Sequence, residues 1–154
     1  MTYCIRLLSP VEKAPSAVEL DDWLRTEGFP VSIDPHPGPN DWGRLTITDA
    51  QGRTLVVRRH LRRGDENPVD EEVDSFLDHL LEMDDSPAVR RVEEGLREAR
   101  QMLILEVPDD YPWGTEQTLA DAVVQVLAER TKALVQADGE GFYTSDGELI
   151  LELD

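Results

Sequence analysis

The sequence predicts an α+β fold in which two βαβββ halves with a mainly antiparallel sheet are joined by an inserted helical hairpin. Apolar residues at strand spacing alternate along the chain with apolar residues at helical spacing. The order of elements expected over residues 2–63 recurs over residues 100–153, with helical periodicity in residues 68–99 between them. A chain of 154 residues is long enough for one compact domain, 1–154, without a disulfide or metal. Each half is expected to be ferredoxin-like or similar.

The first half begins with a strand over residues 3–8, which is apolar on both faces. Ser16 and Glu19 form the pattern of a capping box, and Gly28 is placed to end the helix that follows. Alternating apolar residues at 29–33 predict a short second strand.

The remaining part of this half predicts a β-hairpin. Prolines at 35, 37 and 39 are expected to exclude regular structure before it. Apolar residues at 45–47 and 55–57 then flank a turn at 49–52, and the second strand is expected to reach an arginine cluster before Gly64. The cluster consists of Arg53, Arg58, Arg59, Arg62 and Arg63.

The spacing of apolar residues also predicts the elements of the insert and of the second half. Steps of three and four between apolar residues predict an acidic amphipathic helix after Pro68 and a second helix from Ser86. Residues 102–107 carry the strongest strand pattern of the chain. After it we expect a helix from Thr115 to Lys132, then strands at 133–137, 142–144 and 149–151, the last two flanking an Asp146-Gly147 turn.

Paired βαβββ modules resemble those of the vicinal oxygen chelate superfamily, whose metal site between the modules uses His and Glu on inward-facing strands. The resemblance covers element order alone, and tandem ferredoxin-like folds fit that order equally well. In this chain the first strand of each half has no His. Glu106, Glu152 and His60 offer the required chemistry, but no spacing joins them, so we expect no metal and no cofactor.

The charge excludes several partners. Asp and Glu number 33 against 15 Lys and Arg, a net charge of -18, so nucleic acid and anionic membrane surfaces are disfavoured. No apolar run approaches the ~20 residues of a membrane span, and the N-terminus lacks the pattern of a signal peptide. The single cysteine, Cys4, excludes an internal disulfide framework. These features predict a soluble, cytoplasmic protein of bacterial type.

The distribution of charge predicts a function. Residues 65–85 hold ten acids and no Lys or Arg. Such a face either serves solubility, pairing in part with the arginine cluster, or steers a basic partner towards the protein. We favour a non-enzymatic protein-binding module, such as an immunity-type inhibitor, that docks on a basic protein. The residues expected to bind the partner are Asp70, Glu71, Asp74 and Asp78 in the insert, with Asp109, Asp110 and Trp113 in a loop as an anchor.

Two alternatives stay open. The first is an enzyme or small-ligand-binding protein with a cavity between the halves, where Arg58 or Arg59 holds an anionic ligand and Glu106 or Glu152 lines the pocket. The second is a self-associating structural subunit that forms a homodimer through an apolar strip. We identify no catalytic residue, because no His, Cys or Ser occurs in a recognised catalytic spacing.

Overall fold

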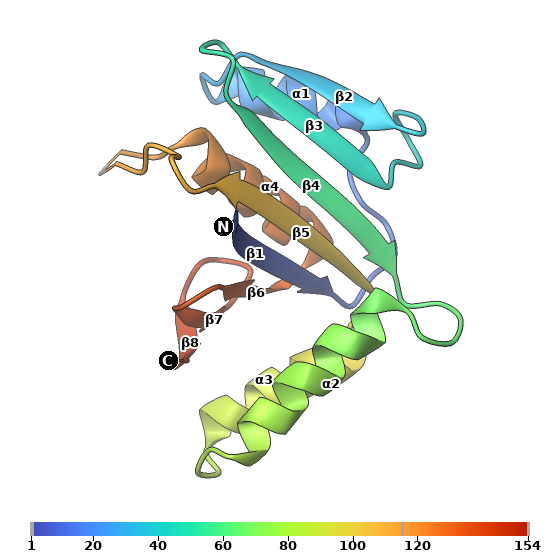
Figure 1. The fold of residues 1–154 in the computed structure, drawn as a ribbon, viewed down its shortest axis with the longest axis vertical. Coiled ribbons are helices and arrows are strands. Elements are labelled where there is room, and N and C mark those ends of the chain that lie inside the picture. Colours follow the sequence, from blue (N-terminus) through green and yellow to red (C-terminus); the bar gives the residue numbers. More distant parts are fainter. Residues whose placement is uncertain (1, 115, 154) are drawn as a thin grey trace.

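In the part of the chain that the structure describes, eight strands form one antiparallel sheet, with helices on both of its faces (Figure 1). The structure is a computed structural model that describes residues 2–114 and 116–153. The strands lie in the order β2-β3-β4-β5-β1-β6-β7-β8. The elements, in chain order, are β1 (Thr2–Ser9), α1 (Ala17–Thr26), β2 (Val31–His36), β3 (Arg44–Asp49), β4 (Thr54–Leu61), α2 (Pro68–Leu81), α3 (Pro87–Glu98), β5 (Gln101–Pro108), α4 (Leu119–Thr131), β6 (Leu134–Ala137), β7 (Gly141–Tyr143) and β8 (Leu149–Glu152).

Strands β1 and β5 form the centre of the sheet. They pair along their whole length, from Thr2 opposite Pro108 to Ser9 opposite Gln101. Because successive side chains of a strand point to opposite faces, Leu7 and Leu8 enter different apolar cores. Both leucines are buried, so the centre of the sheet is covered on each side.

One face of the sheet packs against α1 and α4. The core on this side contains Leu7, Leu105 and Val57 from adjacent strands, together with Leu20 of α1 and Val123 of α4. The other face packs against α2 and α3, which lie side by side (Figure 1). Among the described residues, every helix is too short or too polar to cross a bilayer.

The α+β class and the antiparallel sheet predicted from the sequence are confirmed, whereas the two-half ferredoxin-like repeat and the inserted helical hairpin are not. The two three-stranded meanders join the central pair differently. The first joins β5 through its last strand, β4, while the second joins β1 through its first strand, β6. In addition, β5 pairs with the meander β2-β3-β4, which precedes it in the chain, and β1 pairs with the meander β6-β7-β8.

The bounds of β2 and α4 differ from expectation for identifiable reasons. Strand β2 runs through Pro35 to His36, where the prolines predict irregular structure. β2 pairs only with β3, and an edge strand accepts proline because its outward N–H groups have no partner strand. Helix α4 begins at Leu119, because Thr118 and Asp121 form a capping box there. The expected start, Thr115, lies outside the described residues.

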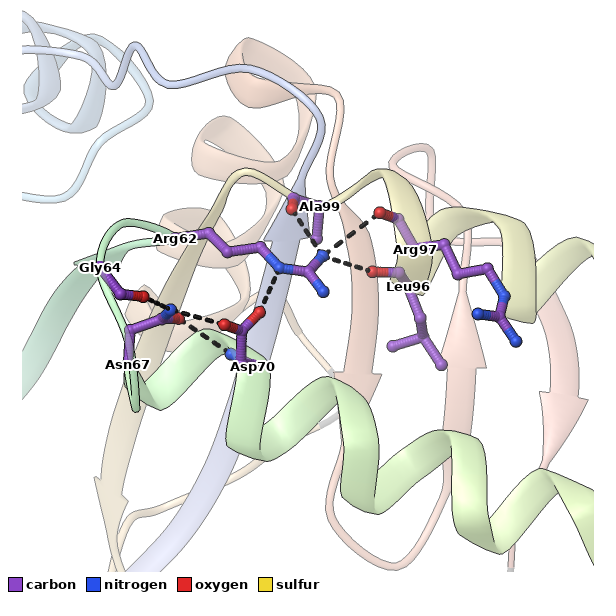
Figure 2. A network of polar contacts seen from close by, with 7 residues as sticks. All are labelled: Arg62, Gly64, Asn67, Asp70, Leu96, Arg97 and Ala99. Carbon is purple, nitrogen blue, oxygen red and sulfur yellow. Dashed lines mark hydrogen bonds and ion pairs between the residues drawn. The ribbon is translucent and has the colours of Figure 1, made fainter.

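Arg62, which directly follows β4, contacts both α2 and the end of α3 (Figure 2). Its Nε donates to Asp70 Oδ1 at 2.6 Å, near the start of α2. Its Nη1 donates to the carbonyl oxygens of Ala99 at 3.0 Å and Arg97 at 3.2 Å, at the end of α3. The last carbonyls of a helix have no N–H partner within the helix, so those at the end of α3 can accept from Arg62. One guanidinium therefore connects the start of α2 with the end of α3. Asn67 completes the network, because its side chain contacts Asp70 through both its amide oxygen and its amide nitrogen.

We expect Arg62→Ala to lower the free energy of unfolding by about 1–2 kcal/mol, because hydrogen bonds to a charged donor are lost at two helix ends. The matched control is Arg91→Ala, an exposed arginine of α3, which should change stability by less than about 0.5 kcal/mol. Urea denaturation followed by circular dichroism measures both. Equal effects of the two substitutions would show that the network does not hold the insert in place.

The same network predicts a pH dependence. The hydrogen bond from Arg62 is the main cause that lowers the pKa of Asp70, against a smaller opposing effect of burial. A lowered pKa stabilises the fold above the unfolded value of about 3.9, and this stabilisation is lost as the pH falls through the folded value. The difference in stability between wild type and Asp70→Asn should therefore be largest near neutral pH and shrink below about pH 4. A constant difference, measured by denaturation at several pH values, would contradict this.

Candidate functional site

The acids expected to bind a partner do not form one surface. Asp70 is held by Arg62 beside the end of α3, close to the start of β5. Asp109, Asp110 and Trp113 follow the other end of β5, which is roughly 26 Å away for a strand of eight residues. Glu71, Asp74 and Asp78 are exposed on α2. The structure therefore separates the loop anchor from Asp70.

Internal ion pairs neutralise part of the acidic stretch at 65–85. Asp70 pairs with Arg62, and Asp85 lies 3.6 Å from Arg90. Glu72 lies 3.3 Å from Nε of Arg6, a half-buried arginine of the central strand β1. Glu71, Asp74 and Asp78 of α2 remain exposed to solvent, as do Asp65, Glu66, Glu82 and Asp84 elsewhere in the stretch.

Trp113 lies at the edge of a cavity of about 660 Å³. The cavity lies between α4 and the sheet, and its floor comes from β1 and β6. Ile5 is opposite Ala137, and Val135 lies two residues before it on the same face. Val124 and Ala128 of α4 complete the apolar part of the lining. The volume lies within the range of about 300–1,000 Å³ that is usual for ligand pockets.

Aromatic rings and carboxylates form the rest of the lining. The Trp113 ring, 46% exposed, contacts Tyr3 edge-on, with centroids 5.9 Å apart and an interplanar angle of 79°. The Trp113 ring also contacts Tyr111, with centroids 4.8 Å apart. The carboxylates are Asp121, Glu140 and Asp146, and no Lys, Arg or His occurs among the described lining residues. The cavity therefore has a negative potential and aromatic walls.

Glu140 is the central polar group of this cavity. It lies in the turn between β6 and β7, where its Oε1 accepts a hydrogen bond from Tyr143 Oη at 2.9 Å. Its other oxygen, Oε2, accepts a hydrogen bond from Tyr3 Oη. Burial and the hydrogen bond to Glu140 raise the pKa of both phenols, burial being the larger cause for each. Both tyrosines therefore remain protonated donors at neutral pH, and each carboxylate oxygen has one partner.

Sequence reasoning selected Trp113 and missed Tyr3, Glu140 and Tyr143. Tyr3 is 137 residues from Glu140, and no periodicity links two positions so far apart. The one local signal for this site is that Glu140 lies in a turn just before the aromatic strand residue Tyr143.

The residues of the small-ligand alternative do not converge. Arg58 Nε donates to Glu106 Oε1 at 2.6 Å, so these two form an ion pair. Arg59 is the next residue of β4 and lies on the opposite face, where its guanidinium is 5.6 Å from the ring of buried Trp42. Glu152 is in β8, at the far edge of the sheet. In the part of the chain that the structure describes, no three His, Cys, Asp or Glu side chains gather as a metal site would require.

Comparison of the chain with protein-family models, with curated proteins and with solved structures finds no match.

The turn that carries Glu140 depends on Gly141. A Cβ at Gly141 would lie 2.1 Å from the backbone oxygen of Leu151 in the paired strand β8, at a φ of +147°. Since backbone cannot move aside cheaply, Gly141→Ala should cost about 3 kcal/mol. Gly139→Ala is the control, because a Cβ there meets nothing within 4 Å and only its φ of +74° is strained, at about 1 kcal/mol. Thermal denaturation of both variants checks this, and an equal loss would contradict the close approach of β7 and β8.

Proposed function

We propose that the protein is a non-enzymatic binding module that docks on a basic protein and receives a cationic side chain in the cavity at Trp113. The observation that carries the proposal is the composition of the cavity, which combines aromatic rings and three carboxylates with no described basic residue. An amine or guanidinium over aromatic faces is attracted by the rings, and a neighbouring carboxylate adds to that attraction.

Charge supports the same partner class at longer range. A net charge of -18 raises the rate of association with a cationic protein, and the exposed acids Glu71, Asp74 and Asp78 of α2 contribute to this steering. Asp109 and Asp110 lie next to the anchor Trp113 and extend the acidic surface around it. Asp70 has a structural part in this scheme, because Arg62 holds it.

Inhibition of a basic toxin, in the manner of an immunity protein of the bacterial cytoplasm, is the biological role that we propose for such docking. An inhibitor of this kind needs fast association, which electrostatic steering supplies. It also needs slow dissociation, which a partner side chain held in the cavity at Trp113 supplies. The unpaired thiol of Cys4 agrees with a reducing compartment.

Titration with a synthetic peptide rich in Lys and Arg tests the proposal. We expect Trp113→Ala to weaken binding about tenfold or more in calorimetry, because an aromatic anchor carries much of the energy of an interface. Asp74→Asn, on α2, is the control for general charge and should change the equilibrium affinity less than threefold while lowering the association rate at low salt.

Two results would contradict this proposal. An acidic peptide of the same length that binds as tightly as the basic one would exclude charge recognition. A basic peptide that binds Trp113→Ala as tightly as wild type would exclude the cavity as the anchor site. Circular dichroism of the variant confirms that its fold is intact, as expected for a side chain that is nearly half exposed.

A further inference from the structure

We propose that the group the cavity receives is a quaternary ammonium, and specifically the trimethylammonium of a methylated lysine side chain on the basic partner. This inference rests on the proposed function and adds the chemical class of the cation. Three features of the cavity carry it: the angle between its rings, the occupied oxygens of Glu140 and the apolar floor.

The rings form a corner. Tyr3 and Trp113 meet at 79°, so the cavity has two nearly perpendicular aromatic walls. A trimethylammonium group spreads its charge over its methyl groups, and ring faces at right angles contact several of these at once. Aromatic cages of this kind recognise quaternary ammonium ligands in proteins. Tyr143 adds a third ring to the lining.

Glu140 supplies charge, and two of its roughly four acceptor positions are already filled. Its Oε1 already accepts from Tyr143 and its Oε2 from Tyr3. An arginine binds a carboxylate best through two free oxygens, and a lysine ammonium has three N–H donors to satisfy. A quaternary ammonium has no N–H, so it gains the attraction of the carboxylate without needing a lone pair. The two phenols therefore disfavour unmethylated cations relative to the methylated one.

The floor opposes strongly hydrated cations. Ile5, Val135 and Ala137 give the floor no hydrogen-bonding side chain, so an N–H directed there would lose its water without replacement. Methyl groups in the same place make dispersion contacts and bury apolar surface. Gln125 and Asp146 lie elsewhere in the lining and leave the mouth polar.

The test compares three peptides of one sequence that differ at a single side chain: lysine, trimethyllysine and a neutral analogue with a tert-butyl group. We expect trimethyllysine to bind the full chain about tenfold more tightly than lysine, and the neutral analogue to bind at least tenfold more weakly than trimethyllysine. Calorimetry measures the three affinities. Free choline is the fourth arm, and should bind more weakly than the trimethyllysine peptide.

The double variant Tyr3→Phe/Tyr143→Phe isolates the role of the phenols. It keeps both rings but frees both oxygens of Glu140, so we expect affinity for the lysine peptide to rise and the preference for trimethyllysine to fall below about threefold. A merely structural role of the hydroxyl groups would lower both affinities together. Glu140→Gln is the matched control, and should weaken both cationic peptides without changing the neutral one.

The outcomes separate the two proposals. Equal affinity for lysine and trimethyllysine overturns this inference and leaves the proposed function standing. Failure of every cationic peptide to bind overturns both. A neutral analogue that binds as well as trimethyllysine overturns the recognition of charge by the cage, and choline binding more tightly than the peptide overturns the assignment to a protein side chain.

Discussion

The pairing of β1 with β5 is the interaction on which the rest of the structure depends. Each of these strands carries a three-stranded meander on its outer side, so the pair joins the two parts of the sheet. Their alternating side chains also supply both cores, as Leu7 and Leu8 show. The cavity follows from the same arrangement, because Tyr3 and Ile5 of β1 meet the residues of β6 and β7 at its floor and wall.

Local patterns predict the individual elements well and their arrangement poorly. The capping box at Ser16 and Glu19 depends on residues three apart, and the structure contains it. A similar signal at Thr118 and Asp121 was present in the sequence and fixes the start of α4. Strand order depends instead on pairing between distant segments, which no local pattern encodes. The tolerance of Pro35 likewise depends on the place of β2 at the sheet edge.

The candidate site was predicted in one part only. Trp113 is conspicuous as an aromatic residue in an acidic loop, whereas Tyr3 and Tyr143 resemble ordinary strand residues until the sheet brings them to Glu140. The total charge of the chain could be used to predict a class of partner, whereas the role of an individual acid could not be predicted. Asp70 belongs to an acidic run in the sequence, yet its nearest strong contact is Arg62, only eight residues earlier in the chain. Opposite charges pair wherever the backbone brings them together. The unpaired acids exposed on the surface are therefore fewer than the acids of the corresponding sequence segment.

The long separation between the central strands has a kinetic consequence. Partners in the β1–β5 pair are 92 to 106 residues apart. During synthesis, β1 leaves the ribosome early but cannot pair until nearly the whole of β5 has emerged. Until then β4 also lacks β5 as its neighbour in the sheet. Non-local pairing of this kind slows folding and leaves open strand edges meanwhile. The high negative charge of the chain counteracts aggregation at this stage, because unfinished chains repel one another.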